Sequence, residues 1–319
     1  MNIKSIYTVG AAFCCLTIFS GCDFESNKTK SDKLCDRALV EFKVKNYKVS
    51  LADYRKAAEL DSTNGRAFEG MGSNQYHLKK YDSALSNEFK AQRLNPELKN
   101  VNNWIGLIKS ELGDYQGSIE YYNKSIEQGG EDIAKDYVGR GADFYDLGDY
   151  DKAMQDETKA IQMDADIENG YYWRALIKER MGDYKGSIED HLKSLDHVAN
   201  KGMDYEDLAV DESYLGDNTK ALEYINMAIP ADSTLKNAYN WRAAIKHDMG
   251  DYKGSAEDYT ASLKIGANKG KDYEGRAIDE YHLKDYTDAL SDINLAIQSD
   301  TTLKQATGWK KSIEEALRK

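Results

Sequence analysis

Proline, cysteine and long apolar runs are all scarce in this chain of 319 residues. Only two prolines occur. Because proline breaks the hydrogen-bond ladder of a helix, this scarcity favours a mostly helical chain. The longest apolar run, residues 6–19, is short for a membrane span. Four cysteines are present, two of them inside that run, so we expect a fold that does not depend on disulfides.

Basic charge is also in short supply. The net charge is −12, and 31% of the residues are charged. A nucleic-acid ligand needs a basic stripe opposite its phosphates, so we expect no nucleic-acid partner. No Gly-x-Ser-x-Gly nucleophile elbow occurs, and His191 and His197 are six residues apart, a spacing that does not put them on a common helix face. The histidines are interpreted as surface or packing residues, and no metal site, cofactor or enzymatic activity is expected.

Two other motifs fall short of known binding loops. Residues 266–272 resemble a phosphate-binding loop but are one residue short and lack Ser or Thr after the lysine. Asp164, Asp166 and Glu168 resemble the start of a calcium loop. The glycine of that loop comes late, at Gly170, and no closing glutamate follows. Neither motif predicts a ligand.

A tyrosine recurs about every 34 residues, usually after a Gly-Asp pair. The tyrosines are Tyr47, Tyr81, Tyr115, Tyr150, Tyr184, Tyr252 and Tyr286, and Asn218 fills the one missing slot. A fixed period of this length is typical of stacked helical hairpins, none of which can bury its apolar face alone. The period divides residues 31–302 into eight units, which begin near residues 31, 65, 99, 134, 168, 202, 236 and 270.

Each unit contains two amphipathic helical patterns, one on either side of the tyrosine turn. Counted from the start of the unit, the eighth, twentieth and twenty-seventh places hold only Ala, Gly or Ser, as in Ala175, Ser187 and Ser194. Small residues at fixed places let two helix backbones cross closely, and a larger side chain would overpack the crossing. We therefore predict that each unit is an antiparallel helical hairpin.

These small residues, the aromatic at the fourth place and the Gly-Asp-Tyr turn resemble the tetratricopeptide repeat, or TPR. The fourth-place aromatics are Phe68, Tyr137, Tyr171, Tyr205, Tyr239 and Tyr273. The resemblance implies an all-α fold, an α-solenoid in which about eight TPR helix pairs form a right-handed superhelix with first helices lining a concave groove. Residues 303–319 are expected to add a capping helix with a polar outer surface.

The N-terminus resembles a bacterial lipoprotein signal. Lys4 precedes the apolar run, and Ser20 and Gly21 stand just before Cys22. The resemblance implies a signal peptide over residues 1–21, lipidation of Cys22 and a polar tether over residues 22–30. An ordinary secretory signal or an uncleaved anchor is the alternative. Acylation of Cys22 would leave Cys35 without a disulfide partner. The expected location is the bacterial cell envelope, at the outer rather than the inner membrane of a Gram-negative cell.

All four tryptophans lie one double unit apart, at Trp104, Trp173, Trp241 and Trp309. Asparagine precedes the first three by four residues and hence shares their helix face. An amide can bond a peptide backbone and an indole supplies contact area, so these pairs predict a peptide-binding groove. The predicted partner-binding residues are Asn100, Trp104, Asn169, Tyr172, Trp173, Asn237, Asn240 and Trp241. Packing of each tryptophan on a neighbouring repeat is the alternative.

The resemblance implies a non-enzymatic scaffold for protein–protein interaction. TPR proteins that bind the terminal carboxylate of a chaperone use lysine and asparagine at set places of the groove. In this chain the fifth and ninth places of a unit hold other combinations, such as Asn103 with Leu107 or Tyr172 with Leu176. We therefore expect no such clamp. We predict a lipid-anchored scaffold that binds a peptide or protein surface in the groove. The alternative is an accessory factor that positions an envelope enzyme of the cell-wall or polysaccharide machinery. A small-molecule hydrolase or binding protein would need a cluster of titratable residues, which the sequence does not predict.

An arginine at the seventh place occurs only in units with an aspartate sixteen residues later. The pairs are Arg37 and Asp53, Arg140 and Asp156, Arg174 and Asp190, Arg242 and Asp258, and Arg276 and Asp292. Because the turn lies between them, each pair is predicted to join the two helices of a hairpin by a bidentate ion pair. Shared ancestry of duplicated units, without contact, is the alternative. Lysines are also expected to face acidic pairs one unit on, Lys178 facing Asp211 and Glu212, and Lys246 facing Asp279 and Glu280.

Overall fold

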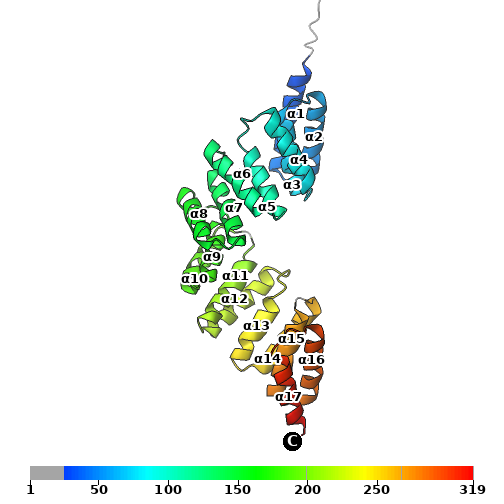
Figure 1. Ribbon diagram of the computed structural model, residues 1–319, viewed down its shortest axis with the longest axis vertical. Coiled ribbons are helices and arrows are strands. Elements are labelled where there is room, and N and C mark those ends of the chain that lie inside the picture. The colour runs from blue at the N-terminus through cyan, green and yellow to red at the C-terminus, as the bar shows by residue number, and fades with distance from the viewer. Residues whose placement is uncertain (1–24, 199, 267, 319) are drawn as a thin grey trace, which may run out of the picture. The chain divides into compact units, whose positions relative to one another are not determined.

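The computed structural model describes residues 25–198, 200–266 and 268–318. These residues form seventeen α-helices, and no strand is found among them (Figure 1). Consecutive helices pack on one another within residues 27–94 and within residues 101–317, and first helices also touch first helices, as α5 (Val101–Glu111) touches α7 (Ile133–Asp146) and α13 (Ala238–Asp248) touches α15 (Lys269–His282). Contacts that run from hairpin to hairpin are those of an α-solenoid.

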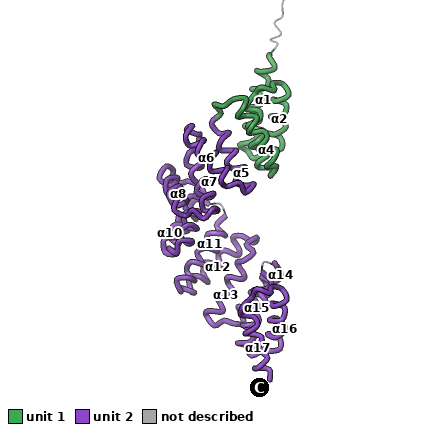
Figure 2. The backbone as a smooth tube through the Cα atoms, in the orientation of Figure 1, with its two compact units in different colours: residues 1–98 green, residues 99–319 purple. Residues whose placement is uncertain are grey.

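The chain divides into two compact units, which Figure 2 colours separately. Unit 1 ends at Leu98 and contains two helical hairpins: α1 (Asn27–Lys43), α2 (Tyr47–Leu60), α3 (Gly65–His77) and α4 (Tyr81–Leu94). Unit 2 begins at Lys99 and contains six hairpins and a last single helix. Its helices are α5 (Val101–Glu111), α6 (Tyr115–Gln128), α7 (Ile133–Asp146), α8 (Tyr150–Met163), α9 (Gly170–Arg180), α10 (Tyr184–Ser194), α11 (Gly202–Tyr214), α12 (Asn218–Ala231), α13 (Ala238–Asp248), α14 (Tyr252–Ile265), α15 (Lys269–His282), α16 (Tyr286–Ser299) and α17 (Ala306–Leu317).

The predicted signal peptide, residues 1–21, and Cys22 lie outside the described residues. Helix α1 begins at Asn27 because the Ser26 hydroxyl caps it, accepting a hydrogen bond from the Thr29 amide at 3.1 Å. Residues 27–30, which were expected in the tether, therefore form the first turn of α1. None of the described helices is long and apolar enough to cross a membrane.

A glycine and an aspartate build the turn inside five of the eight hairpins, and Lys45, Lys79 and Lys284 take the left-handed place of the glycine in the other three. Gly182 has a φ of 81°, and this left-handed conformation ends the first helix. Asp183 then caps α10, its Oδ1 accepting a hydrogen bond from the Gly186 amide at 3.0 Å. The same aspartate cap begins α6, α8, α12 and α14. In these five hairpins the Gly-Asp pair thus fixes the turn through local backbone chemistry.

The predicted close crossings lie in the core. Ala175, at the eighth place of its unit, has no exposed surface. In three of the four units with serine at the twentieth place, its hydroxyl donates to the carbonyl at the eighth place: Ser118 Oγ lies 2.8 Å from the Gly106 oxygen, and Ser255 Oγ lies 2.8 Å from the Ala243 oxygen. In these units a buried hydroxyl fits the crossing without losing its hydrogen bond.

Each of the five arginine–aspartate pairs expected from the sequence is a bidentate ion pair within one hairpin. Between Arg174 and Asp190 both N–O distances are 2.7 Å. The Arg174 side chain is 16% exposed, whereas that of Arg37, in the first described hairpin, is 61% exposed. The ion pair of the first described hairpin is therefore much more open to water than that of the fifth repeat.

The predicted lysine ladder between units is wrong. Lys178 Nζ lies 2.7 Å from Asp190 Oδ2, and Lys246 Nζ lies 2.7 Å from Asp258 Oδ2. Each lysine follows the arginine of its own hairpin by four residues and so shares its helix face. The lysine therefore joins the arginine–aspartate pair within the hairpin rather than reaching the next one.

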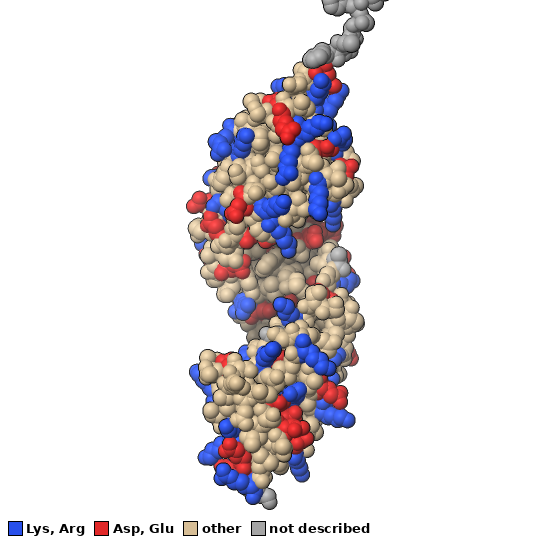
Figure 3. All heavy atoms as spheres, turned by 90° about the vertical axis from the view of Figure 1, so that its right-hand side faces the viewer, with Lys and Arg blue, Asp and Glu red and all other residues tan. Residues whose placement is uncertain are grey.

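Charge is distributed differently in the two units. Basic residues slightly outnumber acidic ones in unit 1, whereas acidic residues are in clear excess in unit 2. On the face drawn in Figure 3, side chains of both signs are interspersed over the molecule. The negative net charge of the chain therefore comes from unit 2.

Candidate functional site

Three asparagine–tryptophan pairs stand at the starts of first helices in unit 2. Asn100, Asn169 and Asn237 precede α5, α9 and α13. In each pair the tryptophan backbone N–H donates to the asparagine carbonyl at 2.9 Å. Within the described residues, none of the three asparagine side chains caps its own helix. The structure thus brings the two members of each predicted pair together on one helical turn.

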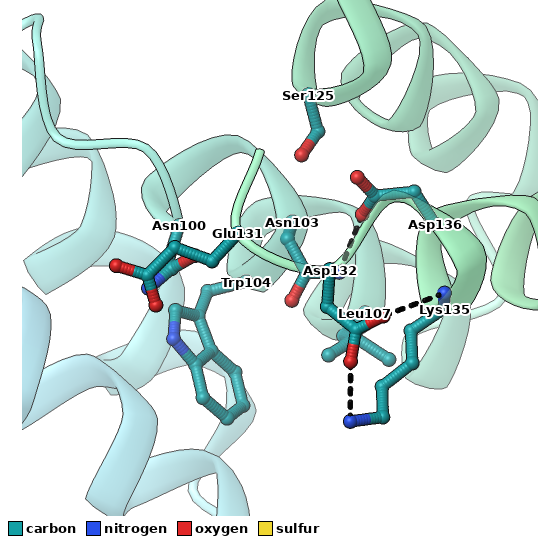
Figure 4. Close-up of a pocket in the computed structure, with 9 residues that line it drawn as sticks. All are labelled: Asn100, Asn103, Trp104, Leu107, Ser125, Glu131, Asp132, Lys135 and Asp136. Atoms are coloured by element: carbon teal, nitrogen blue, oxygen red, sulfur yellow. Dashed lines mark hydrogen bonds and ion pairs between the residues drawn. The ribbon is translucent and has the colours of Figure 1, made fainter. Parts of the chain in front are cut away.

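The pair formed by Asn100 and Trp104 borders a cavity of about 330 Å³ (Figure 4). Helices α5, α6 and α7 and the loop before α7 form its walls. Figure 4 shows the indole beside Asn100 and Glu131, with Asp132 and Lys135 on the other side. The lining residues are Asn100, Asn103, Trp104, Leu107, Ser125, Glu131, Asp132, Lys135 and Asp136.

Asp136 is the most buried acidic group of this cavity. Its side chain accepts a hydrogen bond from Asn103 Nδ2 at 2.7 Å. Burial raises the pKa of Asp136, and the nearby Ser125 hydroxyl and Asn103 amide counter that rise. At the edge of the cavity, Asp132 caps α7 and pairs with Lys135, at 2.6 Å between Oδ2 and Nζ. Three acidic residues against one lysine give the cavity an acidic character.

Two predicted partner-binding residues have contacts inside the array. Asn240 occupies the place of Asn103, and its amide donates to Asp272 Oδ1 at 2.6 Å, which joins α13 to α15. Tyr172, at the same place of α9, lies edge-on to His191, with ring centroids 5.7 Å apart. Both residues therefore contribute to packing between hairpins. The recurrence of Asn at this place with Asp at the third place of the next unit is the sequence signal that could have shown it.

The tryptophans are half-buried, and all four have contacts inside the array. Trp173 lies edge-on to Tyr145, with centroids 5.7 Å apart, and Trp309 lies edge-on to Tyr281 at 5.5 Å. Trp241 packs on a cluster of buried residues that includes Ile245. Packing on a neighbouring repeat therefore accounts for part of each of these rings. The exposed remainder is the surface that a partner could contact.

The hairpin that carries the cavity matches a known family model. The model is described as a tetratricopeptide repeat and covers residues 100–128, which span α5 and α6. A TPR repeat-containing protein of Methanocaldococcus jannaschii is 23% identical to this chain over 292 residues, which cover 74% of this chain and 50% of that protein. The chain thus spans about half the length of the curated relative it matches.

Solved structures share the architecture. The crystal structure of the APC/C hetero-tetramer Cut9–Hcn1 gives a TM-score of 0.62 at 14% identity, over 91% of this chain and 57% of that one. PilW, described as a widely conserved type IV pilus biogenesis factor, gives a TM-score of 0.58 at 17% identity, over 63% of this chain and 92% of that one. The fold is a TPR solenoid. A TPR solenoid presents arrays of helix faces to other proteins and so supports a role in protein–protein interaction.

One cluster in this TPR solenoid escaped the sequence-based interpretation. His191, which was taken for a surface or packing residue, is fully buried. Its ring nitrogen and one carboxylate oxygen each of Glu179 and Asp211 lie within 4.8 Å of one another. These three residues come from three helices of two successive units, so no spacing along the chain brings them together.

Proposed function

We propose that this TPR solenoid is a non-enzymatic scaffold, held in a bacterial envelope by a lipid on Cys22, that binds an extended peptide or a protein surface along the asparagine–tryptophan faces of α5, α9 and α13. The cavity beside Trp104 carries the binding part of this proposal. Its half-buried indole supplies contact area, and the Asn100 amide can bond the backbone of a partner.

The chemistry of the cavity favours a basic segment. Glu131, Asp132 and Asp136 line it, and acidic residues outnumber basic ones in unit 2 as a whole. A lysine or arginine that enters beside Trp104 would meet these carboxylates and the indole. We therefore propose that the partner offers a basic residue within extended backbone, and we expect the affinity to fall as salt screens this attraction.

Crosslinking in intact cells, followed by purification from solubilised membranes, tests the groove. Trp104→Ala should lower recovery of the partner by about tenfold or more, as expected for an aromatic anchor of an interface. Met181→Ala is the matched control, because Met181 is 54% exposed at a hairpin turn remote from the pair. An unchanged set of partners for a folded Trp104→Ala protein would overturn the groove proposal.

The anchor is tested separately. Cys22→Ser should abolish incorporation of a labelled fatty acid, and should release the protein from membranes or leave an uncleaved precursor. A single acyl chain binds a membrane only marginally and two chains hold firmly, so loss of the lipidated cysteine should be decisive. Cys35→Ser should change neither result. If the wild-type chain takes up no label in its own host, the anchor is wrong and the groove proposal stands untouched.

A further inference from the structure

A cluster of buried ionisable groups lies where α9, α10 and α11 meet. His191 on α10 has no exposed surface, and Asp204 and Asp211 on α11 are also buried. Glu179, near the end of α9, stands at the edge of the cluster with its side chain 21% exposed. The cluster therefore joins the fifth repeat to the sixth and meets solvent on the side of Glu179.

Corresponding places in the other repeats show what this cluster replaces. At the twenty-fourth place of three odd units stand Tyr54, Tyr122 and Tyr259. Each ring fills the space left by a glycine in the next unit: a Cβ on Gly70, Gly139 or Gly275 would lie 2.2–2.4 Å from that ring. In the fifth unit His191 stands in the place of the tyrosine, and in the sixth unit Asp207 stands in the place of the glycine. An aromatic ring packed on glycine has thus been exchanged for a pair of ionisable side chains.

Asp211 lacks the hydrogen bond that the aspartates at the same place of two other units accept. Asp143 and Asp279 occupy the same place in their units, and each accepts a hydrogen bond, from Ser110 Oγ at 2.6 Å and from His247 Nδ1 at 2.6 Å. The residue at the place of Ser110 and His247 is Glu179 here, a second carboxylate rather than a donor. Among the described residues neither oxygen of Asp211 has a hydrogen-bond partner, although the Ser187 hydroxyl lies close enough to lower the pKa of this carboxyl against the effect of burial.

His191 is oriented as a metal ligand usually is. Its Nδ1 lies 2.7 Å from Asp204 Oδ1, and Ser194 Oγ donates to the other oxygen of Asp204 at 3.1 Å. Its Nε2 points to Glu179 Oε1 at 3.1 Å. Histidines that bind metals characteristically donate the second ring N–H to a carboxylate, which fixes the tautomer and the ring plane. Asp204 supplies that carboxylate, so Nε2 is the nitrogen directed at Glu179 and Asp211.

Four acidic side chains and one histidine meet in this cluster. Glu179, Asp204 and Asp207 lie near the His191 ring, and Asp211 lies beside His191 and Glu179. A cation bound between the His191 ring and the carboxylates of Glu179 and Asp211 would give the buried oxygens of Asp211 a partner.

We propose that Glu179, His191 and Asp211 bind one divalent transition-metal ion of the zinc class, with Asp204 as the residue that positions His191. One imidazole and two carboxylates suit zinc, whereas calcium and magnesium prefer oxygen alone. Ligand atoms around a tetrahedral zinc lie about 3.3 Å apart, given bonds of about 2.0–2.2 Å. The distance from Nε2 to Glu179 Oε1 already meets this, and all three ligand atoms lie within 4.8 Å.

Such a site would be a clamp between repeats, separate from the groove at Trp104. Its ligands come from α9, α10 and α11, so bound metal would fix the sixth repeat on the fifth. With three protein ligands, a tetrahedral ion would have one position left for water. His191 must lose its proton to bind through Nε2, so binding should release protons and weaken at low pH.

Titration of the full-length chain with zinc tests the site, after a chelator has been used and removed. We expect one tight equivalent at about pH 7.5, a rise in Tm of about 5 °C at saturating metal, and no comparable response to magnesium. Asp204→Asn should lower the affinity about 10–100-fold, as loss of a supporting carboxylate usually does. His191→Tyr, which restores the residue of the other odd units, should abolish the site.

Matched variants keep this test decisive. Asp279→Asn changes the corresponding acid of the eighth repeat and should leave zinc binding intact. Glu179→Gln keeps the size of a ligand side chain and should still lose the metal if His191→Tyr fails to fold. Cobalt gives an independent signal, because tetrahedral coordination produces visible absorption that these ligand variants should remove. Zinc binding weaker than about 10 µM, about −7 kcal/mol, or equal binding by wild type, Glu179→Gln and Asp211→Asn, would overturn the proposal.

Discussion

The ion pair inside the fifth repeat lies where water is only partly excluded. The Arg174 guanidinium is 16% exposed and its partner Asp190 is 1% exposed. Lys178 binds the same carboxylate at 2.7 Å. An ion pair in such a place adds little stability when whole, because desolvation offsets the attraction, but the loss of one partner leaves an uncompensated charge. The pairs therefore favour one arrangement of each hairpin over alternatives.

Asp190→Ala should destabilise the fifth repeat by about 3 kcal/mol, because it strands Arg174 and Lys178. The double change Arg174→Leu with Asp190→Tyr copies Leu208 and Tyr224 of the sixth repeat and should recover most of that loss. Denaturant unfolding measures both. Asp53→Ala is the control and should cost far less, since Arg37 is 61% exposed. Equal losses at Asp190 and Asp53 would mean that burial does not set the cost.

A second residue-scale feature is a pair of buried glutamates. Glu88 and Glu157 have no exposed surface, and none of their carboxylate oxygens has a hydrogen-bond partner among the described residues. Burial raises the pKa of both well above the ordinary value. Each fits because the eighth place beside it is glycine, at Gly72 and Gly141. We infer that both stay protonated in the folded chain.

The contribution of Glu157 to the free energy of unfolding should therefore fall as the pH rises. Above the ordinary glutamate pKa, about 4.3, the unfolded chain releases a proton that folded Glu157 retains, so the unfolded state gains. Below it the contribution of Glu157 is fully present. Glu157→Met should stabilise the chain by about 1–3 kcal/mol at about pH 7.5 and by less at about pH 4.5. Denaturant midpoints at both values give the result. The exposed Glu120→Met should show no such difference, and a pH-independent gain at Glu157 would contradict a buried neutral acid.

At the scale of helices, glycine decides how closely neighbours approach. Tyr259 on α14 lies over Gly275 on α15, and a Cβ there would come within 2.3 Å of the ring. Helix α15 also carries the local cost of an interior glycine, which alanine would remove. The two effects oppose each other, and the sign of their sum depends on whether the tyrosine can move.

Gly275→Ala should destabilise the chain by about 1–3 kcal/mol, because overpacking exceeds the gain in helix propensity. Gly308→Ala is the control within α17, since nothing lies within 4 Å of a Cβ at that place. It should stabilise by about 0.5–1 kcal/mol. Thermal unfolding of both variants suffices. A stabilised Gly275→Ala protein would show that the tyrosine–glycine contact is loose.

Patterns that repeat in sequence were the predictable part of this structure. The tyrosine turn, the small residues at the crossings and the arginine–aspartate pairs all stand at fixed places. A pattern found in one unit therefore predicts the same structure in the others. Features found in only one repeat were missed. His191 and Asp207 depart from the pattern, and their meeting depends on how two hairpins stack. Lys178 was assigned to the wrong carboxylate because its spacing along the helix was ignored in favour of the neighbouring unit. The sequence predicted that the groove residues share a helix face, and the contact of Asn240 with Asp272 was open to prediction as well, because Asn103 and Asp136 repeat the same two places.

At the scale of the molecule, stability should be a sum of local interfaces. Helices of unit 2 contact mainly their neighbours in sequence, so a disturbance at one end has few routes to the other. Ile313 on α17 and Ile105 on α5 have no exposed surface and lie far apart in sequence within this unit. They are therefore matched probes of how far a local defect spreads.

Ile313→Ala should cost about 2–5 kcal/mol locally. Amide hydrogen exchange should accelerate in α15, α16 and α17 while the amides of α5, α6 and α7 keep their protection. Ile105→Ala should give the reverse pattern, which controls for a general loosening of the fold. If either variant accelerates exchange evenly from α5 to α17, unit 2 unfolds as one cooperative body. Its repeats would then be coupled more strongly than contacts between nearest neighbours can explain.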